Sequence, residues 1–401
     1  MEKYLPFTTS LLGSMPRSKK IMQYRRKVQS GEISLDELDS LVAEETLKIV
    51  EMQKRCNVDI ITNGELSRDN YVSFVSDKLK GVTMMNMGDM LEYIEDKKAF
   101  EQILEILDVP AVSIKNAICT GKVEYNKELV ADEMAELKKI TDAPVKATLP
   151  GPYLMTRSMW LPALSKKYYK NKEELGQDII KVLKQEIDRL AIIKTDVVQF
   201  DEPVLTEVVF SEGHTRSFMC AALSEKKDPK EELEFATGLI KEIVEYAKGK
   251  NIAVSLHVCR GNWSKNESTL LSGSYTPLLP LFEEVKPDIL TLEFSTPRAG
   301  ELSSLLESEI IRKNCILGLG VINPRTDNIE TSEEIVERAE EALKWLPKEK
   351  VWLNPDCGFA TFANRPVNTM EIIEKKLIQL DKAKNCLLYT SDAADDLLCV
   401  D

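Results

Sequence analysis

Short apolar runs alternate with amphipathic segments along most of the chain. Runs rich in β-branched residues predict strands at Pro6–Ser10, Asp59–Thr62, Val145–Leu149, Val197–Asp201, Ile252–Val258, Ile289–Phe294, Ile316–Val321 and Val351–Asn354. Apolar residues at helical spacing predict helices at Leu35–Arg55, Lys172–Ile193, Lys230–Gly249, Gly300–Arg312 and Ser332–Trp345. Strands that are nearly all followed by helices indicate parallel βαβ units.

Two parallel architectures fit this alternation, a closed (β/α)8 barrel and an open doubly wound sheet. The position of reactive side chains favours the barrel. At or just past the ends of different strands lie Glu65, Asp201, the pair His257 and Cys259, Glu293 and Cys357. Barrels gather catalytic residues from many strand ends around one mouth, whereas open sheets concentrate them at one switch point. We therefore predict an α/β fold with a single (β/α)8 TIM barrel.

Two segments depart from the alternation. Gly81–Val123 contains methionines, acidic residues and short strand fragments, which predicts an insertion over the barrel mouth. The last sixteen residues, Cys386–Asp401, follow a helical pattern and switch to a sequence with four Asp and no basic residue. We interpret them as a non-native tail translated from adapter DNA, although a genuine acidic tail remains open. The barrel is thus expected to occupy residues 1–385.

The composition narrows the function classes. At 43% hydrophobic and 30% charged residues, with no apolar run near membrane-spanning length, the chain is expected to be globular, cytoplasmic and without a membrane partner. A net charge of −13 argues against a nucleic-acid partner. Eight cysteines without framework spacing favour reduced thiols and a metal site over disulfides.

The first candidate for chemistry is a histidine–cysteine pair. Only two histidines occur in the chain, and His257 ends an apolar run two places before Cys259. Residues i and i+2 of a strand face the same side, so imidazole and thiolate can point at one spot. Both are ligands that zinc prefers. The second histidine, His214, lies in a polar loop and is interpreted as a surface or lid residue.

Two further strand ends supply candidate ligands. Glu293 ends one apolar strand, and Cys357 follows another in a turn that contains proline. With His257 and Cys259 they would give two sulfurs, one nitrogen and one oxygen, a set that tetrahedral zinc accepts. A weakly bound carboxylate would leave a coordination position on the zinc ion for an incoming thiol. The alternative for a buried cysteine is a small core hydrophobe, which is how we interpret Cys56, Cys119, Cys220 and Cys315.

Other polar residues at the expected mouth suit an amino-acid substrate. Ser14 follows a glycine in the turn after the first strand, where N–H groups and a hydroxyl can hold a carboxylate. Glu65 and Asp201 can pair with an ammonium group, and they are also the candidate catalytic residues. An ordinary turn serine and a helix-capping acid are the alternatives for Ser14 and Glu65.

Seven segments occur in an order that is itself informative. They are Thr8–Pro16 (TTSLLGSMP), Thr62–Leu66 (TNGEL), Val145–Pro152 (VKATLPGP), Gln199–Pro203 (QFDEP), His257–Gly261 (HVCRG), Thr291–Ser295 (TLEFS) and Asn354–Gly358 (NPDCG). On these segments the chain, from Thr8 to about Asn368, resembles the catalytic barrel of cobalamin-independent methionine synthases and their short single-barrel relatives. Any one segment alone would be weak. By this resemblance, His257, Cys259, Glu293 and Cys357 match the family's catalytic zinc ligands.

The resemblance implies methyl transfer to the thiol of homocysteine, giving methionine, with zinc as cofactor. Ser14, Glu65 and Asp201 match the residues that hold homocysteine. An alternative that shares barrel and zinc–thiol chemistry is an alkyltransferase of the epoxyalkane–coenzyme M type, but it would not need two acids to hold an ammonium.

Two departures leave the methyl donor open. Full-length members carry a second, N-terminal barrel that helps hold the folate's polyglutamate tail, and only one barrel is expected here. Where the family often has a loop with a histidine tied to proton delivery, this chain has Gly320–Arg325 (GVINPR). The donor is therefore expected to be methyltetrahydrofolate or a methylcobamide, with a corrinoid protein as a candidate partner.

Overall fold

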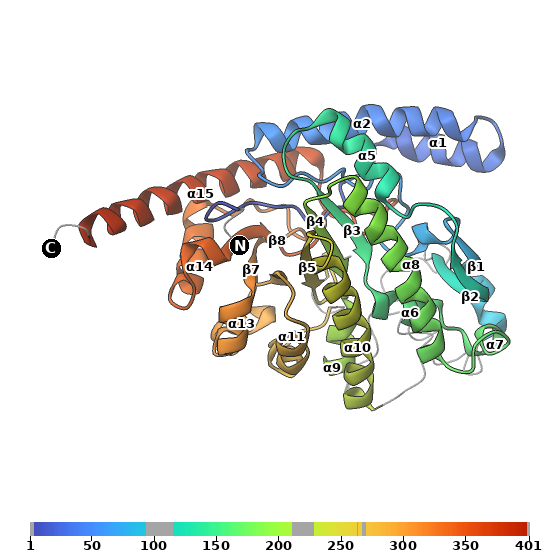
Figure 1. The fold of residues 1–401 in the computed structure, drawn as a ribbon. Helices are drawn as coiled ribbons and strands as arrows, with labels where there is room; N and C mark the ends of the chain where they lie inside the picture. The colour runs from blue at the N-terminus through green and yellow to red at the C-terminus, as the bar shows by residue number, and fades with distance from the viewer. Residues whose placement is uncertain (1–3, 94–114, 211–227, 263, 267–269, 399–401) are drawn as a thin grey trace.

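The main sheet of the chain is parallel and has six strands in sequence order. A computed structural model describes residues 4–93, 115–210, 228–262, 264–266 and 270–398 (Figure 1). The strands of the main sheet are β3 (Lys146–Pro150), β4 (Val197–Asp201), β5 (Ala253–Val258), β6 (Ile289–Glu293), β7 (Ile316–Ile322) and β8 (Val351–Pro355). Every neighbouring pair is parallel.

The two segments predicted as the first strands close this sheet into a barrel. They form parallel bridges instead of full ladders: Thr9 with Leu353, Ser10 with Ile60, and Ile61 with Val145. These bridges connect β8 through the N-terminal segment and residues 59–62 back to β3. The ring therefore has eight parallel members, which confirms the predicted (β/α)8 barrel.

The helices alternate with these strands largely as the periodicity predicts. Their bounds are α1 (Lys19–Ser30), α2 (Leu35–Arg55), α3 (Met87–Met90), α5 (Ala131–Ile140), α6 (Pro152–Met159), α7 (Pro162–Ser165), α8 (Lys172–Ile192), α9 (Val204–Phe210), α10 (Pro229–Lys248), α11 (Leu279–Val285), α12 (Ser303–Leu306), α13 (Glu309–Asn314), α14 (Ser332–Leu343) and α15 (Met370–Leu398). Ser34 begins α2 with a capping box to Glu37. The helix predicted at Gly300–Arg312 is instead two short helices, because the Ser308 side chain caps a new one at Ile311 N.

The interior of the barrel changes from apolar to polar along its axis. One apolar cluster contains Ile60, Val197, Ile289, Ile316 and Trp352. Two residues further along their strands, the inward side chains are polar and buried: Gln199, Thr291 and Asn354. The apolar cluster therefore stabilises one end of the barrel, and hydrogen-bonding groups fill the space toward the other.

The predicted insertion contains a separate antiparallel hairpin of β1 (Leu79–Asn86) and β2 (Lys115–Tyr125). The hairpin packs beside α6, α7 and α8, the helices that follow β3 (Figure 1). Residues 94–114 lie outside the described residues, so the placement of the insertion over the mouth stays a prediction.

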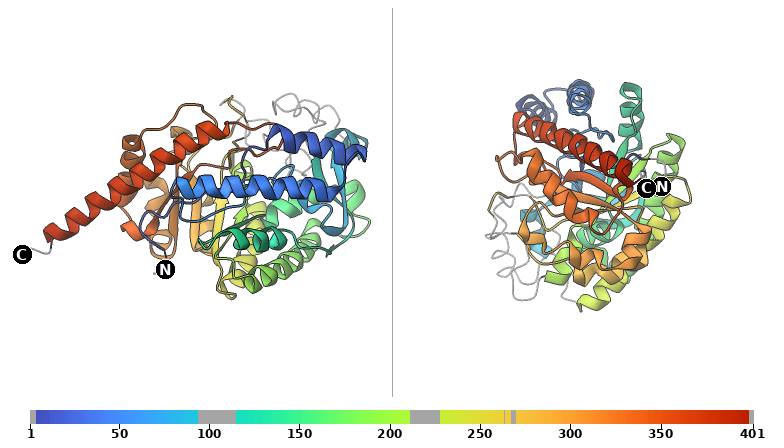
Figure 2. Two further views of the ribbon diagram at one scale, coloured as in Figure 1. Left: turned by 90° about the horizontal axis from the view of Figure 1, so that it is seen from above. Right: turned by 90° about the vertical axis from the view of Figure 1, so that its left-hand side faces the viewer.

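The last helix extends past the rest of the fold. Figure 2 shows the end of α15 projecting from the body of the molecule.

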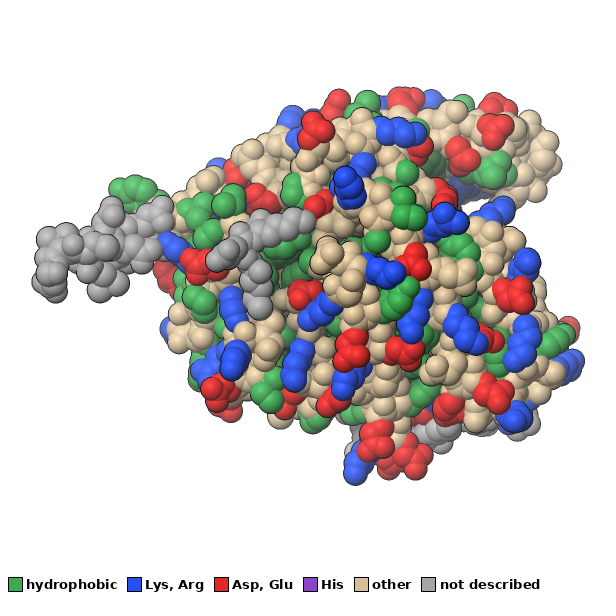
Figure 3. All heavy atoms as spheres, viewed as in Figure 1, with side chains coloured by type: hydrophobic (Ala, Val, Ile, Leu, Met, Phe, Trp, Pro, Cys, Tyr) green, Lys and Arg blue, Asp and Glu red, His purple; other side chains and the backbone are tan. Residues whose placement is uncertain are grey.

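On the face drawn in Figure 3, basic and acidic side chains are interspersed. Among the described helices, none is both long and apolar enough to cross a membrane.

Candidate active site

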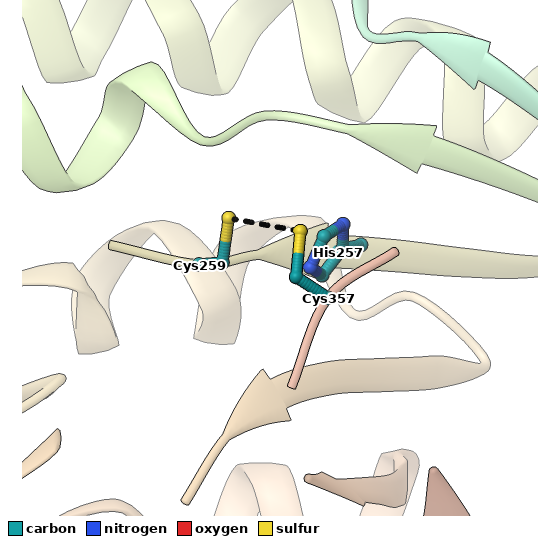
Figure 4. Close-up of side chains that lie close together, drawn as sticks. All are labelled: His257, Cys259 and Cys357. Atoms are coloured by element: carbon teal, nitrogen blue, oxygen red, sulfur yellow. Dashed lines mark hydrogen bonds between the residues drawn. The ribbon is translucent and has the colours of Figure 1, made fainter. Parts of the chain in front are cut away.

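The site begins with three side chains at the carboxyl end of the barrel. His257 and Cys259 lie at and just past the end of β5, and Cys357 follows β8 (Figure 4). One ligand atom from each residue lies within 4.8 Å of the other two. His257 and Cys259 are buried, and Cys357 is partly buried. The alternation of side chains along β5 brings the first two to one spot, as predicted.

These residues fit a zinc ion. The Sγ atoms of Cys259 and Cys357 are 3.9 Å apart. Two thiolates bound tetrahedrally at the usual zinc–sulfur distance would be about 3.8 Å apart. Two sulfurs and an imidazole nitrogen are also the donors that zinc prefers over harder cations. A fourth position would then be left for a carboxylate or a substrate thiol.

Asp201 fixes the orientation of the imidazole. The parallel register of β4 and β5 sets Asp201 beside His257, and their Oδ1 and Nδ1 atoms are 2.8 Å apart. Gln199 donates to the same carboxylate oxygen at 2.8 Å. Because Nδ1 faces Asp201, Nε2 is the nitrogen that could bind a metal; it lies 3.4 Å from Asp356 O, in the turn that carries Cys357. Burial lowers the pKa of His257, but the Cys259 thiolate and Asp201 outweigh burial and raise it to about 10.

The contact between the two thiols lowers the pKa of one and raises the pKa of the other. The hydrogen bond from Cys357 lowers the pKa of Cys259 to about 5, against the opposing effect of burial and with support from His257. The same hydrogen bond, together with burial, raises the pKa of Cys357 well above its ordinary value. This lowered pKa favours the thiolate form of Cys259, which is the form that binds metals.

The turn that carries Cys357 is attached to the end of β6. Asp356 accepts hydrogen bonds from the backbone N–H groups of Phe294 and Ser295 at 3.1 and 3.0 Å. A Cβ added to Gly320 would lie 2.3 Å from Asp356 Oδ1, so glycine allows this close approach. Asp356 therefore holds the Cys357 turn in place.

Glu293, predicted as the fourth ligand, is not part of the three-residue group. Its Oε2 accepts from Arg260 N at 3.1 Å and Asn262 Nδ2 at 2.9 Å, and its Oε1 lies 3.0 Å from the Arg298 guanidinium. Burial raises the pKa of Glu293, but Arg298 and Arg260 outweigh burial and lower it. Its carboxylate is held as an anion by these cations, and its role as a zinc ligand stays a prediction.

The residues predicted to hold substrate lie at the same end of the barrel. A Cβ added to Gly358, the neighbour of Cys357, would lie 2.1 Å from Ser14 Oγ, and Phe359 N donates to Ser14 O at 2.9 Å. Glu65 is buried and accepts from Thr148 Oγ1 at 2.5 Å, and a Cβ on Gly13 would lie 2.1 Å from Glu65 Oε1. Burial raises the pKa of Glu65, although Arg68 opposes this.

The acid after Asp201 has a different task. Glu202 is fully buried, and its two carboxylate oxygens accept from Tyr153 N and Leu154 N, each at 2.8 Å. It therefore caps the start of α6. Neighbouring residues face opposite sides of a strand, so the alternation along β4 predicts that Asp201 and Glu202 point in different directions.

The segment that lacks the family's histidine still reaches the site. Arg325 Nε donates to Asn262 Oδ1 at 2.9 Å, and Asn262 in turn binds Glu293. Lys376 of α15 holds this loop through Asn323 O at 3.1 Å. His214 lies outside the described residues.

A parallel barrel that gathers two thiols, an imidazole and carboxylates at the ends of its strands is typical of metal-dependent enzymes. The family model described as the catalytic domain of cobalamin-independent synthases matches residues 6–372. The chain belongs to this family and is, by that membership, a methyltransferase.

Individual relatives agree with this assignment. The methionine synthase of Saccharolobus solfataricus is 26% identical over 366 residues, which are 91% of this chain and 92% of that protein. That of Sulfolobus acidocaldarius is 29% identical over 355 residues, with 87% and 85% covered. A 5-methyltetrahydropteroyltriglutamate–homocysteine methyltransferase of Bacillus licheniformis is 23% identical; the match covers 96% of this chain but only 44% of that protein.

The fold is also that of solved relatives. The structure of a B12-independent methionine synthase from Shewanella sp. W3-18-1, in complex with selenomethionine, has a TM-score of 0.71 at 20% identity. The match covers 97% of this chain and all of that one, at 100%.

Proposed function

We propose that the chain transfers a methyl group to the thiol of L-homocysteine and so forms methionine. The observation that carries this proposal is the group of His257, Cys259 and Cys357, which fits zinc and lies at the same end of the barrel as Glu65 and Asp201. The names of the relatives, methionine synthase and homocysteine methyltransferase, support the same reaction.

The three ligands would hold zinc, with Glu293 as the proposed fourth. Zinc bound there would lower the pKa of a substrate thiol and make it a nucleophile at neutral pH. Asp201 would keep the His257 ring in one tautomer, with Nε2 toward the metal.

The remaining residues would orient the amino acid. Glu65 and Asp201 supply anionic oxygens for an ammonium group, and Ser14 supplies a hydroxyl and a backbone N–H for a carboxylate. A thiol without an ammonium group, such as coenzyme M, would offer these acids no cation beyond those of the protein, Arg68 at 3.5 Å from Glu65 and His257 at 2.8 Å from Asp201. The acids therefore favour an amino-acid thiol.

Methyl transfer forms a carbon–sulfur bond and breaks the bond between the methyl carbon and the donor. The bonding electron pair leaves with the donor. If the donor is methyltetrahydrofolate, its N5 must also take up a proton, because an unprotonated amine is a poor leaving group. A methylcobamide needs no such proton. Both donors are included in the proposal, because the segment Gly320–Arg325 contains no histidine that could deliver this proton.

The test is methionine formation from homocysteine with three donors side by side: methyltetrahydrofolate as mono- and triglutamate, and methylcobalamin. Turnover with folate would show that another group protonates N5. Turnover with methylcobalamin alone would assign a corrinoid donor. Zinc-loaded protein that forms no methionine from any donor would contradict the proposal.

A further inference from the structure

A backbone conformation that most residues avoid lies at the candidate substrate site. Glu65 has a φ of 56°, in the left-handed region, and Gly64 before it has a φ of 77°. A residue other than glycine is uncommon in this region, and such residues gather at functional sites, where surrounding contacts keep them in place. Glu65 is also one of the two acids proposed to hold the substrate ammonium.

One buried arginine supplies contacts that keep this turn in place. Arg17 is 6% exposed, and its guanidinium donates to four backbone carbonyls: Met15 at 3.3 Å, Ala360 at 2.6 Å, and Glu65 and Arg68 at 2.9 Å each. The last two bonds come from one nitrogen, Nη2. The turn itself is closed by Arg68 N, which donates to Glu65 O at 3.0 Å. Arg17 therefore holds both ends of the turn that begins at Glu65.

The conformation of this turn directs the Glu65 carboxylate into the barrel. Thr148 Oγ1 donates to Glu65 Oε1 at 2.5 Å, and a Cβ added to Gly13 would lie 2.1 Å from the same oxygen. The direction in which a side chain leaves the chain follows from the backbone conformation. If Glu65 relaxed to an ordinary negative φ, its carboxylate would therefore turn away from Thr148.

We propose that Arg17 is a positioning residue for amino-acid recognition, which holds Glu65 in the left-handed conformation so that its carboxylate can accept the substrate ammonium. This inference rests on the proposed amino-acid substrate. Arginine suits the task because its planar guanidinium has five N–H donors and can bind several carbonyls at once. A lysine at this position would keep the charge but would reach fewer carbonyls.

The metal group has a separate attachment. Arg17 reaches Ala360, three residues after Cys357, but Asp356 fixes the Cys357 turn through two backbone N–H groups that follow β6. Variants of Arg17 are therefore expected to keep their zinc. A loss of amino-acid recognition at unchanged zinc content would distinguish positioning from a general loss of structure.

The experiment compares the binding of L-methionine and 4-(methylthio)butanoate to the zinc-loaded protein by calorimetry. The second compound lacks only the ammonium group, so the ratio of the two affinities measures ammonium recognition. Hydrogen bonds to a charged group predict that wild type prefers methionine by about 10–100-fold. Arg17→Met should lower this preference about tenfold by weakening methionine alone, and Arg17→Lys should lie between the two. Mass spectrometry should find the zinc content of wild type in both variants.

Two further variants show where the effect arises. Arg25→Met is the matched control: Arg25 donates to carbonyls of the same loop, those of Leu66 and Ser67, and its loss should leave the preference for methionine as in wild type. Glu65→Gln should lower the preference as Arg17→Met does. The double variant should lower it no further, because both changes remove the same interaction.

The outcomes separate this inference from the proposed function. Circular dichroism checks that each variant folds, and Arg17→Lys decides if Arg17→Met does not. An unchanged preference in a folded Arg17 variant, an equal loss of affinity for both compounds, or additive effects of the Arg17 and Glu65 changes would each overturn the role of Arg17. An equal loss of preference in Arg25→Met would also overturn it, because any disturbance of the loop would then suffice. A wild-type protein without a preference for methionine would contradict the amino-acid substrate itself, and this inference with it.

Discussion

At the scale of single residues, the site depends on which side chains the strand register sets next to each other. The period of two along β5 was sufficient to predict that His257 and Cys259 converge. The contact between Asp201 and His257 needs the pairing of β4 with β5, which one sequence does not reveal. The cations around Glu293 come from separate loops and were likewise not predictable.

Removing the second thiol tests the metal site. Cys357→Ser should lose zinc and activity and keep most of the fold, because Cys357 lies in a turn at the barrel mouth and is only partly buried. Zinc content by mass spectrometry, with circular dichroism for the fold, measures both effects. Cys315→Ser is the matched control, since Cys315 lies away from the metal group just before β7. Full zinc occupancy in Cys357→Ser would remove this residue from the site.

The contact between Asp201 and His257 predicts an effect on metal affinity separate from the ligands. Asp201→Asn should weaken zinc binding by about 10–100-fold, because an amide orients the imidazole less strongly than a carboxylate. Competition with a chelator of known affinity measures this change. Asp178→Asn, which removes an acid paired with Lys181 on α8, should leave zinc affinity as in wild type. An unchanged affinity in Asp201→Asn would limit Asp201 to substrate binding.

At the scale of elements, periodicity predicted the strands and long helices well. It predicted the bounds of α2 fully and missed α1, whose apolar positions are few. It could not predict that the first two strands form only isolated bridges. Whether a segment forms a single bridge or a full ladder of hydrogen bonds depends on the strands beside it, which lie far away in the chain. Local signals also explain the division of one predicted helix into α12 and α13 at Ser308.

The cap of α6 gives a prediction for stability and its dependence on pH. Glu202→Ala leaves two buried N–H groups without acceptors and should lower the free energy of unfolding by about 2–4 kcal/mol. Burial raises the pKa of Glu202 well above its ordinary value, although the bonds from Tyr153 and Leu154 oppose this. The folded protein therefore keeps this proton at pH values where the unfolded chain has lost it, and stability falls as pH rises past about 4.3.

Glu202→Gln isolates this effect, since glutamine keeps an acceptor but has no proton to lose. Urea unfolding at a series of pH values should show wild type losing stability relative to Glu202→Gln between pH 4 and 7. A stability difference between the two proteins that stays constant across that range would show that Glu202 has the same pKa in the folded and the unfolded state.

At the scale of the whole molecule, the chain has one barrel, and its match covers 44% of the longer Bacillus relative. The candidate metal ligands and the candidate substrate residues all come from this barrel. The net charge of −13 carries no information about the reaction.

The end of α15 allows the interpretation of residues 386–401 to be tested. Leu387 is buried in the core, whereas Tyr389 is 79% exposed and the helix beyond it projects from the body (Figure 2). Deleting residues 391–401 should therefore change neither activity nor the melting temperature. Deleting Cys386–Asp401 should also leave activity unchanged but lower stability by about 1–3 kcal/mol, because a buried leucine is lost. Methionine formation and thermal unfolding of both truncations measure these effects; loss of activity on removal of 391–401 would show that the tail belongs to the working enzyme.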